Sequence, residues 1–222
     1  MQIRSMLIAG SLATATVLGA GQALAFVPWI NPSGNAGTFS WANGGSRDGL
    51  FGSPTVVGGD TFVFFPAGFR AQSTNGGVTI VGDRLEFDLF AAPGFQVSGI
   101  RISEYGDYGV IGAGSSVSAA GSLIATNLDT GATMFNALVT TPGVPITSGF
   151  GNWSGVEALD FVGWTRLHVV IDNDLIAISG ANGAAYIEKK VFAAGFSITL
   201  VPTPGTAALM GLGSLLAVRR RR

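Results

Sequence analysis

Residues 83–90 read Asp83-Arg84-Leu85-Glu86-Phe87-Asp88-Leu89-Phe90 and alternate between charged and apolar side chains. Because successive side chains of a strand point to opposite faces, the leucines and Phe87 share one face and the charged residues share the other. This pattern predicts a β-strand with one face in a hydrophobic core and one face toward water.

Similar segments, rich in Val, Ile, Phe and Thr, recur on both sides of this stretch. They are residues 61–65, 97–104, 108–111, 116–126, 133–139, 166–171, 175–179, 185–192 and 196–200. Glycine-containing turn sequences separate them at residues 43–45, 75–77, 129–131 and 182–183. The spacing predicts an all-β fold, an antiparallel β-sandwich or jelly-roll-like domain over residues 26–200. Within this domain, residues 155–161 are the one candidate for a helix, of one or two turns.

The composition indicates one packed domain and excludes several classes of protein. Glycine and proline account for 34 and 9 of the 222 residues, too few for a disordered chain, and 15 phenylalanines suit a hydrophobic core. The chain has no cysteine, which excludes disulfides and a lipid-modified cysteine. Residues 26–200 carry seven basic and thirteen acidic side chains, and this net charge of −6 disfavours nucleic-acid binding.

The first 25 residues have the layout of a secretory signal peptide. Arg4 precedes an uncharged run at residues 6–20, and Ala23 and Ala25 form a small-x-small site for signal peptidase. We therefore predict a signal helix that is removed to leave Phe26 as the first residue. An uncleaved N-terminal anchor is the alternative, although the run is shorter than the ~20 residues of a stable span.

Residues 201–222 combine a proline motif, a short apolar run and a basic end. The motif is Pro202, Thr203, Pro204 and Gly205, and the run at residues 206–218 includes Leu209, Leu212, Leu215 and Leu216. As a helix this run is roughly 20 Å long, short of a hydrocarbon core of about 30 Å. The four terminal arginines, Arg219, Arg220, Arg221 and Arg222, are expected to stay cytoplasmic and stop the transfer of a short transmembrane helix.

This tail resembles a PEP-CTERM protein-sorting signal, with Thr203 where that family usually has glutamate. The resemblance covers only about the last tenth of the chain. It implies export across the inner membrane, contact with membrane lipid, removal of the tail by an exosortase-type membrane protease, and association with exopolysaccharide or biofilm matrix at the cell surface. A permanent C-terminal anchor and an arginine patch for nucleic acid are the alternatives.

No motif for catalysis or metal binding stands out, so we predict a protein that is not an enzyme and needs no cofactor. His168 is expected on the more polar face of a strand, and no Gly-x-Ser-x-Gly elbow or His-Glu-x-x-His helix is present. With one histidine and no cysteine, a closed zinc site is nearly excluded. The pair Asp172 and Asp174 is expected in a hairpin turn, and calcium at an oxygen-rich loop is kept as an alternative.

The aromatic residues offer a binding hypothesis, because sugars stack on exposed aromatic rings. Tyr105, Asp107 and Tyr108 form the expected exposed loop for a ligand, whereas most tryptophans are assigned to packing. Two functions therefore stand: an exported structural protein of the cell surface or matrix, and an extracellular carbohydrate-binding module. An extracellular hydrolase, with Glu104 and Asp107 or Asp172 and Asp174 as its acids, is third.

Overall fold

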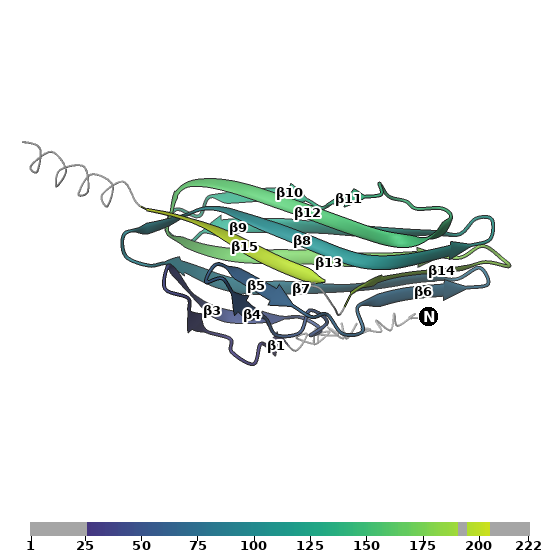
Figure 1. Cartoon of the computed structure of the whole chain (residues 1–222), viewed down its shortest axis with the longest axis horizontal. Helices are drawn as coiled ribbons and strands as arrows, with labels where there is room; N and C mark the ends of the chain where they lie inside the picture. The colour runs from purple at the N-terminus through teal and green to yellow at the C-terminus, as the bar shows by residue number, and fades with distance from the viewer. Residues whose placement is uncertain (1–25, 191–194, 205–222) are drawn as a thin grey trace, which may run out of the picture.

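The computed structural model describes residues 26–190 and 195–204, which form two antiparallel sheets packed face to face (Figure 1). One sheet contains β1 (Val27–Pro28), β2 (Gly34–Asn35), β3 (Phe39–Ser46), β7 (Val78–Ala91), β9 (Ser116–Asn127), β10 (Thr133–Ala137) and β13 (Arg166–Ile178). The other contains β4 (Thr55–Val57), β5 (Thr61–Phe64), β6 (Arg70–Thr74), β8 (Phe95–Ile111), β11 (Val139–Thr141), β12 (Gly149–Trp164), β14 (Ala184–Lys189) and β15 (Phe196–Pro204). The predicted β-sandwich is confirmed.

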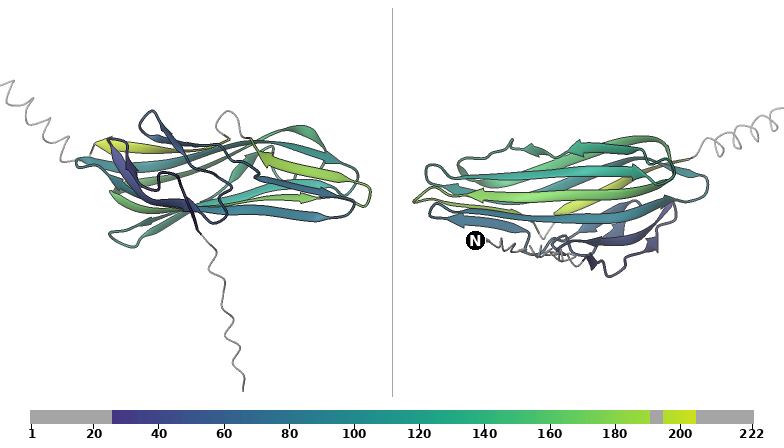
Figure 2. Two further views of the ribbon diagram at one scale, coloured as in Figure 1. Left: turned by 90° about the horizontal axis from the view of Figure 1, so that it is seen from below. Right: turned by 180° about the vertical axis from the view of Figure 1, so that it is seen from behind.

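The first sheet, which we call the back sheet, is centred on β7, β13 and β9. It has the order β1-β3-β7-β13-β9-β10, and Figure 2 shows it from behind the view of Figure 1. Strand β13 pairs along its whole length with β7 on one side and β9 on the other. The charged alternation at residues 83–90 lies in β7, where Leu85, Phe87 and Leu89 are fully buried as predicted.

The second sheet, which we call the front sheet, is organised around β8. Strand β12 pairs with one edge of β8, while β15 and β14 share the other edge. The change from β14 to β15 occurs at Tyr105, whose carbonyl accepts from the Lys190 N–H and whose N–H donates to the Gly195 carbonyl, both at 3.0 Å. Inward side chains of β8, β12 and β14 therefore converge at this junction.

The core between the sheets is dominated by phenylalanine and tryptophan. Phe62 is fully buried, and its ring lies 5.2–5.8 Å from the rings of Trp29, Phe39, Trp41 and Phe87. Burying a side chain of this size contributes about 1.5–3 kcal/mol. The prediction that the phenylalanines pack a core is confirmed.

Several local predictions are wrong, and all of them underestimated strand length. Residues 155–161 are not a helix but part of β12, in which Gly155, Glu157, Leu159 and Phe161 alternate inward. Asp172 and Asp174 lie in the middle of β13, not in a turn, because pairing with β7 and β9 keeps that segment extended. The predicted domain boundary at residue 200 is also too early, since β15 continues through Thr203 to Pro204 beside β8.

The predicted turns have mixed outcomes. Asn75 and Gly76, with φ of 53° and 86°, form the turn between β6 and β7. Asn43, with φ of 56°, instead marks an irregularity within β3. The predicted signal peptide with Ala23 and Ala25, and the tail from Gly205 to the arginines, lie outside the described residues. Within the two described ranges, no helix has the length and apolarity needed to cross a membrane.

Candidate functional site

Two aromatic rings form a platform on the outer face of the front sheet. Tyr186 of β14 and Phe150 of β12 lie in register on either side of Gly109 of β8. A Cβ atom added to Gly109 would lie 2.4 Å from Tyr186 Cε1 and 2.7 Å from Phe150 Cδ1, so both rings occupy the space above this glycine. Phe150 is 66% exposed, and the rings border a hollow of about 100 Å³ that also contacts Gln72 and Ile111.

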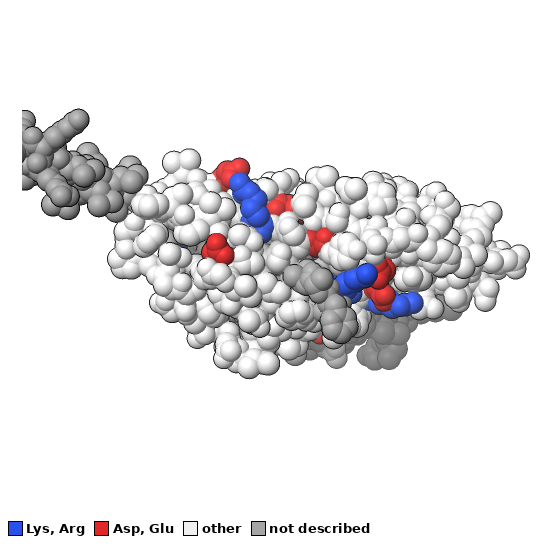
Figure 3. Space-filling model, in the orientation of Figure 1, with Lys and Arg blue, Asp and Glu red and all other residues white. Residues whose placement is uncertain are grey.

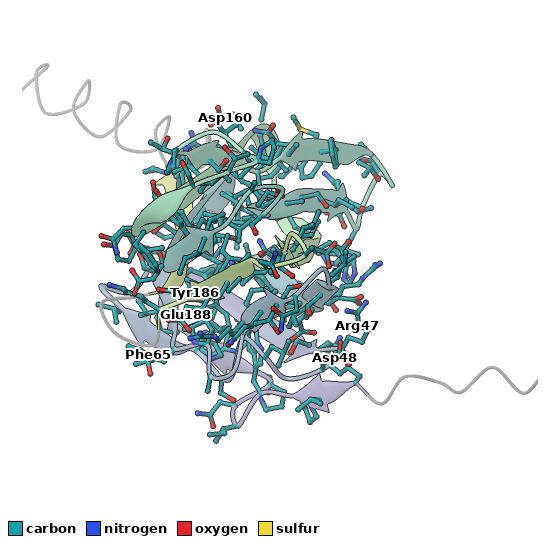
Figure 4. The ribbon with its side chains drawn as sticks, turned by 90° about the vertical axis from the view of Figure 1, so that its right-hand side faces the viewer. Arg47, Asp48, Phe65, Asp160, Tyr186 and Glu188 are labelled. Carbon is teal, nitrogen blue, oxygen red and sulfur yellow. The ribbon has the colours of Figure 1, made fainter. Side chains whose placement is uncertain are left out.

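A row of polar side chains lies beside this platform, two residues further along the same strands. Arg70, Glu188, Asp107 and Asn152 are neighbours in register across β6, β14, β8 and β12. Arg70 donates to Glu188 Oε2 at 2.7 Å, and its guanidinium lies 4.5 Å from the centre of the Tyr186 ring. Tyr186 and Glu188 therefore project from the same side of β14, as Figure 4 shows from the end of the molecule.

The polar row borders a second and larger hollow, of about 400 Å³, lined by Arg70, Asp107, Glu188 and Lys190 among others. Lys190 Nζ lies 3.0 Å from Asp107 Oδ1, and this hydrogen bond raises the pKa of Lys190. Figure 3 shows this face, where charged side chains are few and most of them lie along a diagonal band. The face thus combines aromatic rings with paired donors and acceptors.

The predicted ligand residues are divided between two faces, because they lie within β8 and not in a loop. Tyr105 and Asp107 face outward, where Lys190 Nζ lies 5.2 Å from the Tyr105 ring centre. Tyr108 points inward and packs against the core. A Cβ atom added to Gly151 would lie 3.0 Å from the Tyr108 hydroxyl. The structure therefore places Tyr105 and Asp107 on the same outer face as Tyr186 and Phe150, and places Tyr108 on the opposite face.

A second group of polar residues is buried between the sheets, and we call it the interior cluster: Glu104, Glu157, Asn173 and Lys189. Lys189 Nζ lies 2.5 Å from Glu104 Oε2, and both side chains have no exposed area. Asn173 of the back sheet donates through Nδ2 to Glu104 Oε1. The Glu104 carboxylate thus contacts an amine with one oxygen and an amide with the other.

Aromatic rings enclose the lysine of this cluster. Lys189 Nζ lies 5.2–5.9 Å from the ring centres of Phe51, Phe69, Trp153 and Phe196. Burial lowers the pKa of Lys189, although the attraction of Glu104 partly offsets this effect. The aromatic faces favour the cation, but they cannot replace the hydration that it loses.

Glu157 completes the interior cluster. Burial raises its pKa to about 8, with a further contribution from the negative charge of Glu104 and an opposing one from Lys189. Both of its carboxyl oxygens, and Oδ1 of Asn173, are buried without a hydrogen-bond partner among the described residues. Unpaired buried polar atoms cost free energy, so these three atoms require a functional or chemical explanation.

His168 occupies the polar outer face of β13, as predicted. Its Nδ1 lies 2.8 Å from Asp88 Oδ1, and its Nε2 lies 3.7 Å from Glu86 Oε2. Asp88 also accepts from Asn43 Nδ2 at 2.7 Å. Among the described residues, no group of three or more His, Cys, Asp or Glu side chains is arranged to hold a metal ion.

Comparisons with known proteins concern the fold alone. Neither a family model nor a curated protein matches the chain. Similar solved structures include the CBM22-1 and CBM22-2 xylan-binding domains of Xyn10C from Paenibacillus barcinonensis. The CBM22-1 domain shares 14% identity with this chain, and the match covers 59% of this chain and 86% of that domain. The CBM22-2 domain shares 10% identity, and the match covers 64% of this chain and 94% of that domain. Both matches have a TM-score of 0.24. The enzymatically active domain of tailspike protein 4 from bacteriophage CBA120 shares 9% identity, covers 60% of this chain and 20% of its own, and has a TM-score of 0.21.

The sequence contained signals for several residues that the prediction missed. Alternation along residues 184–189 places Lys189 on the same face as Ala185 and Ile187, which marks it as a buried lysine. Alternation along residues 155–161 likewise places Glu157 with Leu159 and Phe161. The sequence contained no comparable pattern for the platform of Tyr186 and Phe150, because the two residues meet only through the pairing of their strands with β8.

Proposed function

We propose that this chain is an exported, non-enzymatic protein of the cell surface or exopolysaccharide matrix, and that its β-sandwich binds a neutral polysaccharide on the front sheet. The observation that carries the binding proposal is the convergence of Tyr186 and Phe150 over Gly109. Sugars present apolar C–H faces that stack on such rings. The domain's net charge of −6 disfavours an acidic polysaccharide.

The polar row supplies the directional contacts that a sugar needs in addition to stacking. Arg70 provides N–H donors, while Asp107 and Glu188 provide carboxylate acceptors for hydroxyl groups. Because the row lies two residues from the platform, it is about 7 Å away along the strands. A ring stacked on the aromatic platform could therefore place its neighbour in the chain over the larger hollow.

The test is binding of the purified protein to neutral polysaccharides and to the host's own exopolysaccharide, measured by affinity electrophoresis and calorimetry. We expect Tyr186→Ala and Phe150→Ala each to weaken binding about tenfold, equivalent to about 1.4 kcal/mol. Phe135→Ala is the matched control, because Phe135 is 64% exposed in β10 of the other sheet. Equal binding by all three variants would refute the platform, and no binding by the wild type would refute the proposed ligand class.

Delivery to the surface is the second part of this proposal, and it rests on the sequence signals at both ends of the chain. Signal peptidase would remove residues 1–25, and an exosortase-type membrane protease would remove the tail near Pro202 to Gly205 after a transient membrane stage. Intact mass spectrometry of membrane and medium fractions from the native host tests this. A secreted form that begins at Phe26 and ends near Pro204 is expected. Retention of Arg222 in the mature protein would favour the permanent anchor.

A further inference from the structure

The interior cluster brings a primary amine and a side-chain amide to the two oxygens of one buried carboxylate. Glu104 Oε2 lies 2.5 Å from Lys189 Nζ, and Glu104 Oε1 accepts from Asn173 Nδ2. Asn173 belongs to β13 of the back sheet, whereas Lys189 ends β14 of the front sheet. The contact therefore joins the two layers of the sandwich.

We propose that Lys189 and Asn173 become covalently joined by an isopeptide bond between Nζ and the side-chain carbonyl carbon Cγ, with release of ammonia. Glu104 is the catalytic residue, because it touches both reacting groups. The product is a secondary amide that links β14 to β13 across the core.

The proton transfers balance without an external reagent. Glu104 first takes a proton from the Lys189 ammonium, which leaves a neutral amine and a carboxylic acid. The amine attacks Cγ of Asn173 and forms the new N–C bond, and Glu104 gives its proton to Nδ2 as the old C–N bond breaks. Glu104 then takes a second proton from Nζ, so the products are the amide, ammonia and a neutral Glu104.

The surroundings favour each of these steps. Burial among four aromatic rings lowers the pKa of Lys189, which favours the neutral amine that the attack requires. The side chains of Lys189 and Glu104 have no exposed area, so water is kept away from the reacting groups. The reaction also replaces a buried ion pair by neutral groups.

Glu157 lies beside the side-chain amide of Asn173, although no hydrogen bond joins the two groups. A Cβ atom added to Gly121 would lie 2.8 Å from Asn173 Nδ2 and 3.0 Å from Glu157 Oε1, so both groups approach the same point. With a pKa of about 8, Glu157 is protonated at neutral pH and can donate a hydrogen bond. Oδ1 of Asn173, which has no partner among the described residues, is the atom on which negative charge develops during the attack.

Peptide mapping of the purified full chain tests this proposal directly. Arg166 and Lys190 bound a tryptic peptide, residues 167–190, that contains both Asn173 and Lys189. The cross-link predicts a mass lower by about 17 Da, the mass of one ammonia. Trypsin should not cleave after Lys189 in the cross-linked peptide. Fragmentation in the mass spectrometer should release no backbone fragments that end between residues 173 and 189, because the cross-link holds both sides together. Proteolysis before Asp174 should leave the two parts of this peptide joined.

A control is needed because Asn182-Gly183 in the same peptide could lose ammonia by forming a cyclic imide. That product would still be cleaved after Lys189 and would fragment normally, and Asn182→Ala would abolish it. The cross-link should persist in Asn182→Ala and disappear in Glu104→Gln, which keeps both joined residues. A wild-type peptide of full mass that is cleaved after Lys189 would overturn the proposal, whether or not the Glu104→Gln variant folds.

Discussion

The carboxyl group of Glu157 gives the sharpest stability prediction for this protein. Its side chain belongs to β12 and is 2% exposed as a residue, and neither carboxyl oxygen has a hydrogen-bond partner among the described residues. The substitution Glu157→Gln keeps the size of the side chain and removes its ability to ionise. We therefore expect the variant to differ from the wild type mainly in how stability depends on pH.

The magnitude follows from the pKa of Glu157, which rises from 4.5 to about 8 on folding. Between these values the folded protein binds more protons than the unfolded chain, so the free energy of unfolding falls as the pH rises. Each rise of one pH unit inside this range lowers the free energy of unfolding by about 1.4 kcal/mol. The wild type should therefore lose about 3 kcal/mol between pH 4.5 and pH 7 through this group alone, whereas Glu157→Gln should not.

Urea denaturation followed by tryptophan fluorescence, repeated from pH 4 to pH 9, measures this difference. The two proteins are compared in the same state of the Lys189–Asn173 pair, established by the peptide mapping described above, so the difference between their curves reports on residue 157. Any offset caused by altered packing is independent of pH, and the slope is the diagnostic quantity. Glu188→Gln, on the outer face of β14, is the control and should change the free energy by less than about 1 kcal/mol. Parallel curves for wild type and Glu157→Gln would refute the reasoning.

Three further predictions concern the fold and can be checked by the same denaturation assay. Phe62→Ala should cost about 3–5 kcal/mol, because this fully buried ring packs against four others, whereas Phe135→Ala on the surface should stay within about 0.5 kcal/mol. Gly106→Ala should lower the free energy of unfolding by more than about 2 kcal/mol, since the new Cβ would lie 1.9 Å from the Glu188 carbonyl oxygen. Gly143→Ala is the control and should have little effect, because a Cβ added there would have no atom within 4 Å. Asp83→Ala should cost about 3 kcal/mol, because the buried carboxylate accepts three backbone N–H groups at 2.8 Å.

The fold class was predictable because period-two alternation is a local property of the sequence. Leu85, Phe87 and Leu89 report the buried face of β7 without any knowledge of its partners. Strand length was harder to predict, because it depends on pairing. Asp172-Asn173-Asp174 has the composition of a turn, yet β7 and β9 hold it extended and direct Asn173 into the core.

The candidate sites were less predictable for the same reason. Tyr105 and Asp107 were expected at a ligand site, but strand alternation separates them from Tyr108. Tyr186 and Phe150 are 36 residues apart in the numbering and meet only because β14 and β12 flank β8 at Gly109. Side chains that form a surface through strand pairing cannot be grouped from one sequence, whereas a buried Lys189 could have been inferred from its own strand.

Because the chain has no cysteine, any covalent cross-link in this domain must use other side chains, such as those of the interior cluster. A freshly folded chain with an ionised Lys189 and Glu104 bears the desolvation cost of a buried ion pair, so the cluster is a weak source of stability in that state. An amide between Lys189 and Asn173 would remove both charges and close a loop of about 15 residues. In the chain-entropy treatment of disulfides, such a loop raises the free energy of unfolding by about 3 kcal/mol. In a chain without cysteine, this bond would tie β13 of one sheet to the end of β14 in the other, at the junction where β15 replaces β14 beside β8.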